Sequence, residues 1–565
     1  MLQSKDLAEK LQEERKKAEE KDAERRAQKL GLPYLNLVSV KVPTEIKAMA
    51  LVPEEEAKTA LLVPLQLVRK KLVVAVLDPQ KPEAQNIFEK LKKNYKLEIV
   101  VTSLNGLKHA WNYYQYITPE AKEISGKIEI NQENLENVRK AIQNLEDLNK
   151  AIKDFKSPLT SQILEIIVAG ALALRASDVH LEPGETNNVL RLRIDGLLHA
   201  AFSEFTAQVY HSLVTRIKLL SNLKLNIHDQ PQDGRFTIDL ADRDIEIRTS
   251  VIPSEYGETI VMRLLDPLSL KVNLEELGWR LDDLEIVKEE IKKPNGLILN
   301  TGPTGSGKTT TLYAFLKYVF KPEIKIITVE DPIEYHLEGI SQTQVDPDAN
   351  YTFASGLRSI LRQDPNVILV GEIRDKETAE IAMNASLTGH IVFSTLHTND
   401  AVGAIPRLID LGVKPQVLGP ALSLVIAQRL VRLLCQSCKA EKKVTAKTEE
   451  AIKKFLESLS QRVGKSLYKN IKMYEPKGCK ECGGLGYRGR TSIFELFVVN
   501  ETIEEAIYGN PTEIQLKELA KRQGMTTMQE DGVLKMIQGF TSLEEVERLT
   551  GLVSWLHYDK IPSQK

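Results

Sequence analysis

The stretch "GPTGSGKTTT", from Gly302 to Thr311, decides the fold of the longest part of this sequence. It fits the phosphate-binding pattern G-x-x-x-x-G-K-[ST], in which glycines let several backbone N–H groups point at one anion. The apolar run Gly296–Asn300 before it is typical of a strand, and Thr309–Phe320 after it is typical of a helix. This context disfavours a merely tight turn. The residues expected to hold a nucleotide are Gly302, Pro303, Thr304, Gly305, Ser306, Gly307, Lys308, Thr309 and Thr310.

Two side chains of this loop are expected to act on the phosphates of ATP. Lys308 would reach the β- and γ-phosphates as a point charge, and Thr309 would offer its hydroxyl to Mg²⁺. The helix that begins near Lys308 adds the positive end of its dipole. Because Gly307 is followed by Lys308 and Thr309, with no third glycine, a Rossmann dinucleotide loop is disfavoured.

Acidic side chains follow two further apolar runs, "IITVEDPIEY" (Ile326–Tyr335) and "NVILVGEIRD" (Asn366–Asp375). The carboxyl ends of strands face the ligand crevice of an open α/β sheet, so both sets are expected beside the nucleotide. Carboxylates there can hold Mg²⁺ or orient the attacking water. Acidic strand ends that serve only solubility are the alternative. The candidate carboxylates are Glu330, Asp331, Glu334 and Glu372.

A third apolar run, "GHIVFSTLHTND" (Gly389–Asp400), ends in polar residues that include His397. A lone histidine is usually structural. Because this one sits at another crevice-side strand end, a contact with the γ-phosphate is the favoured interpretation.

All four cysteines lie in two C-x₂-C pairs, "CQSC" and "CKEC". This spacing predicts a tetrahedral zinc site, and the predicted ligands are Cys435, Cys438, Cys479 and Cys482. The alternatives are a redox pair and disulfides. Disulfides are disfavoured in a chain expected to be cytoplasmic.

Composition indicates a globular protein of several domains. The chain has 565 residues, of which 42% are hydrophobic and 27% charged, and three or four domains are expected. Lys and Arg number 76 against 78 Asp and Glu, which argues against bulk electrostatic binding of nucleic acid. The apolar run Ile163–Leu174 is too short for a membrane span and contains Glu165. The N-terminus has no apolar signal core, so a cytoplasmic location is expected.

The chain is expected to alternate strands and helices from about Leu274 to Leu430, as in a doubly wound parallel sheet. Hairpin-like strands are expected at Asn188–Leu198 and Arg243–Pro253. The predicted parts are a charged helical or disordered arm (1–30), a first N-terminal domain (31–115), a helical linker without strand signal (116–156), a second N-terminal domain (157–268) and the C-terminal ATPase domain (274–565), which includes the zinc insertion (431–490) and a helical C-terminus (500–560).

Seven stretches together resemble one family, the ATPases of type II secretion and type IV pilus assembly (the GspE/PilB family). They are "SDVHLEP", "RIDGLL", "QDGRF", "GPTGSGKTT", "TVEDPIEY", "LVGEIRDKETAEIAMNASLTGH" and "STLHTN". The similarity extends over roughly residues 157–550. It implies an α/β multidomain protein: a RecA-like P-loop ATPase core, an α/β N-terminal (PAS-like) domain, a further small N-terminal domain and a tetracysteine zinc insertion.

The resemblance also implies roles for individual residues. Glu334 would be the catalytic glutamate, Glu372 would belong to the Walker B region, and His397 to the His box. Arg248 and Arg263 would be cation donors from the N-terminal domain to an ATP site. The helical R-L-G motif with which longer members of the family bind cyclic-di-GMP is missing, and residues 1–30 are charged instead, so that regulation is not expected.

The assembly that the resemblance implies is a homo-hexamer at the inner face of the cytoplasmic membrane. It would hydrolyse ATP to move an inner-membrane platform protein that extrudes pilin or pseudopilin subunits. A cytoplasmic adaptor on the N-terminal domain stays open as a further partner, and nucleic acid is not expected. Two rival functions remain: a motor for DNA uptake or conjugative secretion, and an ATP-binding scaffold with little turnover.

Overall fold

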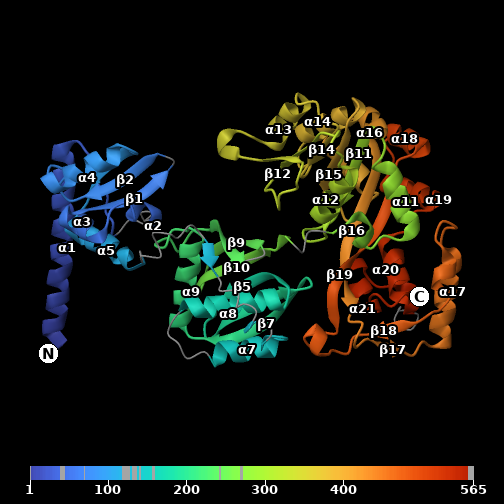
Figure 1. Ribbon diagram of the computed structural model, residues 1–565, viewed down its shortest axis with the longest axis horizontal. Helices are drawn as coiled ribbons and strands as arrows, with labels where there is room; N and C mark the ends of the chain where they lie inside the picture. The colour runs from blue at the N-terminus through green and yellow to red at the C-terminus, as the bar shows by residue number, and fades with distance from the viewer. Residues whose placement is uncertain are drawn as a thin grey trace. The chain divides into compact units, whose positions relative to one another are not determined.

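The computed structural model describes residues 2–38, 45–68, 70–116, 127–129, 137–138, 141–154, 160–240, 243–267 and 272–557. The chain divides into two compact units, Met1–Asp266 and Pro267–Lys565, each of which has its own architecture (Figure 1). Among the described residues, none of the helices combines the length and the apolar character that a membrane crossing needs. Parts of the predicted linker 116–156, and the last residues of the predicted helical C-terminus 500–560, lie outside the described residues.

The first unit begins with a long helix and a small domain built on a three-stranded sheet. The charged segment forms helix α1 (Leu2–Leu30), whose Glu20 accepts hydrogen bonds from Tyr34 Oη (2.5 Å) and Ser103 Oγ (2.6 Å). The sheet has the order β1-β2-β3, with β1 and β2 antiparallel and β2 and β3 parallel. Its elements are β1 (Leu62–Val68), β2 (Lys71–Val76), β3 (Lys96–Val101), α2 (Ile46–Met49), α3 (Glu54–Thr59), α4 (Pro82–Lys92), α5 (Leu104–Trp111) and η1 (Asn112–Tyr116).

The rest of the first unit is a seven-stranded sheet in the order β4-β8-β9-β10-β5-β6-β7. Burial alternates along the strands, as in β6, so one face packs on a core and the other stays open. The strands are β4 (Lys127–Glu129), β5 (Ala176–Glu182), β6 (Asn188–Ile194), β7 (Leu197–Phe205), β8 (Gln232–Leu240), β9 (Arg243–Ser254) and β10 (Gly257–Leu265), and the helices are α7 (Leu145–Lys153), α8 (Thr160–Ala173) and α9 (Ala207–Leu220).

The prediction that 116–156 lacks strands is wrong at one point. Lys127–Glu129 forms β4, which pairs in parallel with Thr237–Asp239 of β8 at the edge of this sheet. A three-residue edge strand makes few side-chain contacts of its own, so its sequence carries little periodic signal.

The second unit is built on a seven-stranded sheet in the order β13-β12-β14-β15-β11-β16-β19. The first six strands are parallel and β19 runs antiparallel to β16. Strand β11 shows why both faces are covered: Leu297 and Leu299 belong to one apolar core with helices α13 and α14, and Ile298 belongs to a second core with helix α12 (Figure 1). The doubly wound parallel sheet that the sequence predicts is confirmed, with one antiparallel edge strand added.

The elements of this sheet and its helices follow one another along the chain. They are η3 (Leu274–Leu277), α11 (Leu281–Glu290), β11 (Gly296–Thr301), α12 (Lys308–Val319), β12 (Ile326–Glu330), β13 (Ser341–Gln344), η4 (Pro347–Ala349), α13 (Phe353–Leu361), β14 (Val367–Val370), α14 (Lys376–Leu387), β15 (Ile391–Leu396), α15 (Ala404–Asp410), α16 (Pro415–Ala421), β16 (Leu422–Leu434) and β19 (Tyr487–Val498).

Between β16 and β19 the chain makes the excursion that contains the cysteines, and after β19 it ends in helices. The excursion holds a two-stranded antiparallel ribbon of β17 and β18. Its elements are β17 (Ala440–Lys442), α17 (Ala446–Ser458), η5 (Lys465–Tyr468), β18 (Met473–Glu475) and η6 (Lys480–Cys482). The helices that follow are α18 (Glu501–Tyr508), α19 (Glu513–Arg522), α20 (Met528–Ile537), α21 (Leu543–Thr550) and η7 (Ser554–Leu556).

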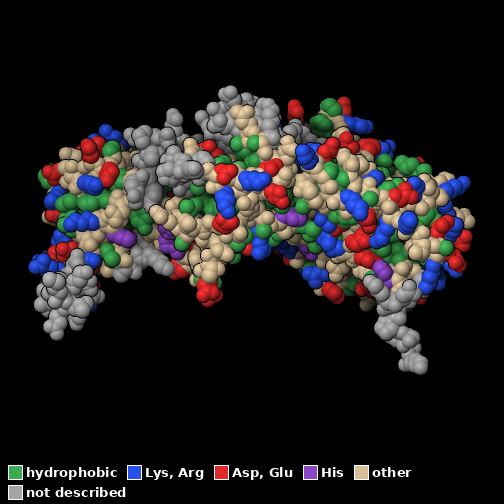
Figure 2. Space-filling view, turned by 90° about the horizontal axis from the view of Figure 1, so that it is seen from below, with side chains coloured by type: hydrophobic (Ala, Val, Ile, Leu, Met, Phe, Trp, Pro, Cys, Tyr) green, Lys and Arg blue, Asp and Glu red, His purple; other side chains and the backbone are tan. Residues whose placement is uncertain are grey.

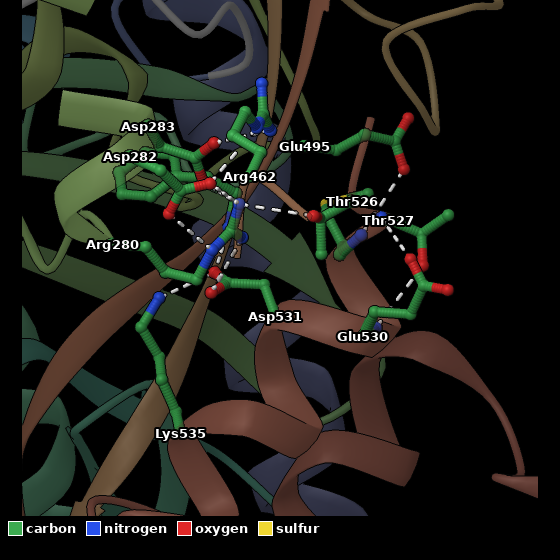
Figure 3. A network of polar contacts seen from close by, with 12 residues as sticks. Arg280, Asp282, Asp283, Arg462, Glu495, Thr526, Thr527, Glu530, Asp531 and Lys535 are labelled. Carbon is green, nitrogen blue, oxygen red and sulfur yellow. Dashed lines mark hydrogen bonds and ion pairs between the residues drawn. The ribbon is translucent and has the colours of Figure 1, made fainter. Parts of the chain in front are cut away.

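A buried ionic cluster joins helix α11, helix α20 and the cysteine-bearing excursion (Figure 3). It balances three cations against three carboxylates: Arg280, Arg462, Lys535, Asp282, Asp283 and Asp531. Arg280 pairs with Asp283 at 2.8 Å, and Lys535 pairs with Asp531 at 2.6 Å. Asp531 also accepts the backbone N–H of Phe494 in β19 at 2.8 Å. Because each buried charge has a partner, the cluster fixes these segments on the sheet without an uncompensated charge.

Candidate nucleotide site and metal centre

The loop of Gly302–Thr311 leaves the carboxyl end of β11 and leads into α12. Gly302 has φ +150° and Gly307 has φ +92°. A Cβ on Gly302 would lie 2.6 Å from the carbonyl oxygen of Gln428, and one on Gly307 would lie 2.9 Å from Nε2 of the same glutamine. Glycine is therefore required at both positions because the loop wraps tightly against β16.

Lys308 is the first residue of α12, and its ammonium group lies inside the curve of the loop. Its Nζ donates hydrogen bonds to the carbonyl oxygens of Gly302 (2.7 Å) and Pro303 (3.1 Å). Burial lowers the pKa of Lys308; the carboxylate of Glu372 opposes this and the guanidinium of Arg429 adds to it. An anion in the loop would favour the charged form of this group.

A buried polar network lies beneath the loop. Oε1 of Gln428 accepts from Nδ2 of Asn300 and from Oγ1 of Thr311, both at 2.9 Å, and its Nε2 donates to Oγ of Ser492 at 3.0 Å. Gln428 is 1% exposed. Side-chain hydrogen bonds thus fix β11, α12, β16 and β19 around the base of the loop.

The carboxylates of the two acidic stretches differ in burial: one is buried and the others are more exposed. Glu330 is 4% exposed and accepts hydrogen bonds from Tyr313, Thr328 and Gln342. Burial raises its pKa. Glu330 is thus part of the core, and the acidic end of the strand is continued by Asp331 and Glu334.

Glu334 is half-buried near the same cluster. Its negative charge contributes to the raised pKa of Tyr313 and of Glu330, both of which are shifted first by burial. The structure therefore places Glu334 within electrostatic reach of a tyrosine on helix α12, the helix that begins with Lys308.

Glu372 and His397 come together at the carboxyl ends of the neighbouring strands β14 and β15. Nε2 of His397 lies 3.6 Å from Oε2 of Glu372, whose other oxygen pairs with Arg374 at 2.5 Å. The side chain of Glu372 is 14% exposed and that of His397 is 54% exposed. The charge of Glu372 also raises the pKa of Lys308 against the effect of burial, so these two side chains lie near each other. Lys308, Glu372 and His397 are therefore gathered where the parallel strands end.

The segment after His397 is held to the base of the loop by contacts that the sequence did not reveal. Thr398 N–H donates to Oγ1 of Thr301 (2.8 Å), and Arg429 donates to the carbonyl oxygen of Asn399 (3.0 Å). A Cβ on Gly302 would lie 3.1 Å from a terminal nitrogen of the same arginine. Arg429 is therefore a cation beside the loop, and the only sequence signal for it is the polar pair Gln428-Arg429 inside the apolar run of β16.

Glu495 of β19 fixes the end of this segment. It is 5% exposed, and it accepts the backbone N–H groups of Ala401 (2.9 Å) and Met528 (3.3 Å). Figure 3 shows Glu495 near Thr526 and Thr527. Burial, with a smaller contribution from Asp400, raises the pKa of Glu495 to about 7. One carboxyl group thus ties the His397 segment to helix α20.

The raised pKa predicts a pH dependence of stability. The folded state binds the Glu495 proton more tightly than the unfolded state, so the stabilisation is complete below the ordinary pKa of 4.5 and is lost as the pH rises to about 7. Between pH 5 and pH 8, the unfolding free energy of the parent should fall relative to that of Glu495→Gln by about 2.5 kcal/mol, from roughly 1.4 kcal/mol per pKa unit.

Denaturant unfolding at several pH values measures this difference. The matched control is Glu457→Gln, at an exposed position of α17, which should leave the pH profile parallel to that of the parent. Parallel profiles for parent and Glu495→Gln would show that Glu495 is ionised throughout this range.

Arg248 and Arg263 lie in the first unit, on β9 and β10, where they are cross-strand neighbours. Nε of Arg248 lies 3.1 Å from Glu246, and Nε of Arg263 lies 2.9 Å from Asp178. Both arginines are therefore on one face of the sheet, each with a carboxylate partner.

The four cysteines gather into one cluster. Their Sγ atoms all lie within 4.8 Å of one another, and Cys435–Cys479, Cys438–Cys482 and Cys479–Cys482 are each 3.8 Å apart. Thiolates about 2.3 Å from a tetrahedral metal would be about 3.8 Å apart, so the cluster fits one metal ion. Sγ of Cys482 also accepts the backbone N–H groups of Cys479 (3.1 Å) and Gly486 (3.2 Å), which orient a thiolate ligand.

Comparison with known proteins gives matches over most of the chain. Residues 153–548 match the family described as type II/IV secretion system protein, and residues 30–121 match the MshEN domain. Type II secretion system protein E of Aeromonas hydrophila is 45% identical over 389 residues, which are 69% of this chain and 75% of that protein. Type IV pilus assembly ATPase PilB of Myxococcus xanthus is 37% identical over 522 residues, which are 91% of this chain and 88% of that protein.

A solved structure shares the fold. The ATPase DotB of Legionella pneumophila superposes with a TM-score of 0.50 at 20% identity, covering 70% of this chain and 97% of that one. The resemblance inferred from the motifs is confirmed by the family match and by both relatives. The chain belongs to the type II/IV secretion system protein family, and its enzyme class is that of the secretion and pilus assembly ATPases.

Proposed function

We propose that this protein is a mechanochemical ATPase that drives the assembly of pilin or pseudopilin subunits through an inner-membrane platform protein, in type IV pilus extension or type II secretion. The observation that carries the proposal is the gathering of Lys308, Glu372 and His397 at the carboxyl ends of parallel strands, beside a loop shaped for phosphate. The two relatives described above carry the names of these two systems.

Each residue of the site would have its own role in ATP hydrolysis. Lys308 neutralises charge on the β- and γ-phosphates, and the Thr309 hydroxyl would hold Mg²⁺, which supplies further neutralisation of the phosphates. Glu334 takes the proton of the attacking water. Glu372 orients His397 and balances Lys308, and His397 contacts the γ-phosphate.

We place the working enzyme in the cytoplasm, as a homo-hexamer at the inner face of the membrane. A site that takes cations from Arg248 and Arg263 of an N-terminal domain would be completed only within such a ring. The cysteine cluster would hold zinc as a structural ion, because four thiolates at tetrahedral spacing suit that metal. The MshEN domain would be the place for a cytoplasmic adaptor.

The rival functions have less support. Figure 2 shows positive and negative side chains intermixed over one face, and the sequence carries 76 basic against 78 acidic residues, so a motor that grips DNA directly is disfavoured. A scaffold with little turnover would not need a carboxylate such as Glu372 near enough to act on the pKa of Lys308.

Turnover by purified protein tests the proposal. Arg248→Ala and Arg263→Ala should each lower turnover sharply, by roughly 10³-fold or more if they act like a borrowed arginine. Nucleotide affinity should stay within about tenfold, or 1.4 kcal/mol. Arg191→Ala, which removes another arginine of the same sheet, is the matched control. Turnover per chain should also rise with protein concentration as rings assemble.

Two results would refute the shared site. One is full turnover in both arginine variants. The other is turnover per chain that is already maximal in a dilute monomer, because such a site would need no neighbour.

A further inference from the structure

A row of charged residues crosses five strands of the seven-stranded sheet in the first unit. The strand register aligns Arg235 of β8 with Arg248 of β9, Arg248 with Arg263 of β10, Arg263 with Asp178 of β5, and Asp178 with Arg193 of β6. Directly opposed side chains lie about 5 Å apart, so neighbouring arginines repel one another. Four of the five positions carry a positive charge, and one carries a carboxylate.

That carboxylate is the most buried side chain of the row. Asp178 is 4% exposed, against 54% for Arg263, 33% for Arg193 and 75% for Arg235. Its Oδ1 accepts from Nε of Arg263 at 2.9 Å. Its Oδ2 lies 3.2 Å from Nε of Arg193 and accepts from Oγ of Ser177 at 2.8 Å. Both oxygens are thus engaged, and each arginine is anchored through Nε while its side chain stays partly exposed.

The electrostatics agree with an ionised anchor. Burial alone would raise the pKa of Asp178, but hydrogen bonds from Arg263 and Ser177 and the charges of both arginines bring it below its usual value. Arg248 has a carboxylate of its own beside it, because its Nε lies 3.1 Å from Glu246. Asp178 therefore acts on Arg263 and Arg193, and Glu246 lies beside Arg248.

We propose that Asp178 is a positioning residue for ATP hydrolysis, which fixes the guanidinium of Arg263 in the direction in which it meets the phosphates. This inference rests on the proposed function, in which Arg263 donates a cation to the ATP site. A free arginine side chain populates many rotamers, so an anchored guanidinium loses less conformational entropy on reaching its ligand. The negative charge of Asp178 also offsets the repulsion between Arg248 and Arg263.

A double-mutant cycle tests the inference. In the parent, Asp178→Asn should lower kcat by about tenfold, because residues in direct contact have coupling energies of this size. Nucleotide affinity should stay within about twofold of the parental value. In the Arg263→Ala background, Asp178→Asn should have no further effect on kcat. Equal reductions in both backgrounds would overturn the inference, because they would mean that Asp178 acts on the fold and not through Arg263.

The matched control breaks a neighbouring pair on the same two strands. Glu182 of β5 lies 3.5 Å from Nε of Arg191 of β6, and Glu182→Gln should leave kcat unchanged. Should Asp178→Asn not accumulate as folded protein, Asp178→Glu keeps the charge and moves it by one methylene. It should then lower kcat only where Arg263 is present, and a reduction that persists without Arg263 would again overturn the inference.

The outcomes separate this inference from the proposed function. Full turnover in Arg263→Ala would remove the role proposed for that arginine, and the inference with it. Reduced turnover in Arg263→Ala together with parental kcat in Asp178→Asn would refute the anchor alone and leave the shared site intact.

Discussion

Replacing Lys308 by alanine is expected to abolish ATP turnover, with a loss of roughly 10³-fold or more, while the second unit stays folded. Under the proposed function, the ammonium group would be the cation of the loop that faces the transferring phosphoryl group, and backbone N–H groups do not replace a full charge. The fold should tolerate the change, because within the part of the chain that the structure describes Nζ of Lys308 donates to two carbonyl oxygens, those of Gly302 and Pro303. Burial lowers the pKa of Lys308 because it disfavours the charged form. Removing this side chain therefore removes an unfavourably solvated charge from the fold.

Steady-state turnover and thermal unfolding of the same preparation measure the two effects. Lys317→Ala, on the last turn of the same helix, is the matched control and should retain turnover. Glu334→Gln separates binding from chemistry, because it should bind nucleotide and fail to hydrolyse it. Parental turnover in Lys308→Ala would exclude the loop as the catalytic phosphate site, and parental turnover in Glu334→Gln would mean that another group takes the proton of the water.

Local patterns predicted the centre of the second unit closely. The strand expected at Gly296–Asn300 is β11, Gly296–Thr301, and the helix expected at Thr309–Phe320 is α12, Lys308–Val319. Both are set by short-range signals: an uninterrupted apolar run, a glycine loop and a helical repeat of apolar residues. The cysteine cluster was predictable for the same reason, because each C-x₂-C pair is a local motif.

Partners distant in sequence could not be predicted from such patterns. Glu330 was expected beside the nucleotide, but Gln342 of the polar strand β13 and Tyr313 of α12 enclose it in the core. Gln428 and Glu495 each sit within a strand of apolar residues, and their functions depend on partners that only the sheet order brings near. A single sequence shows that such a residue is polar and does not show what it contacts.

Removing the metal from the cysteine cluster is expected to unfold the cysteine-bearing excursion locally. Freshly purified protein should contain about one zinc per chain, from the count of four thiolates. Structural zinc contributes roughly 10–16 kcal/mol of folding free energy in zinc-finger peptides, so Cys435→Ser should loosen the segment from Leu434 to Arg490. The nucleotide core should persist, because Asn300, Thr311 and Gln428 hold its base by hydrogen bonds that do not involve the cluster.

Hydrogen exchange with and without a chelator locates the effect. The amides of Cys479 and Gly486, which donate to Sγ of Cys482, should lose protection first, and those of β11 should keep it. Ser437→Ala is the control: it breaks the 2.6 Å bond from Ser437 to Glu481 between the two cysteine pairs but leaves all four ligands. Because Arg462 pairs with Asp282 and Asp283, the middle of the excursion stays joined to α11. Within Leu434–Arg490, loosening should therefore be greatest around the four cysteines and smallest around Arg462. Protein without zinc, or a chelator that changes no amide, would refute a structural metal.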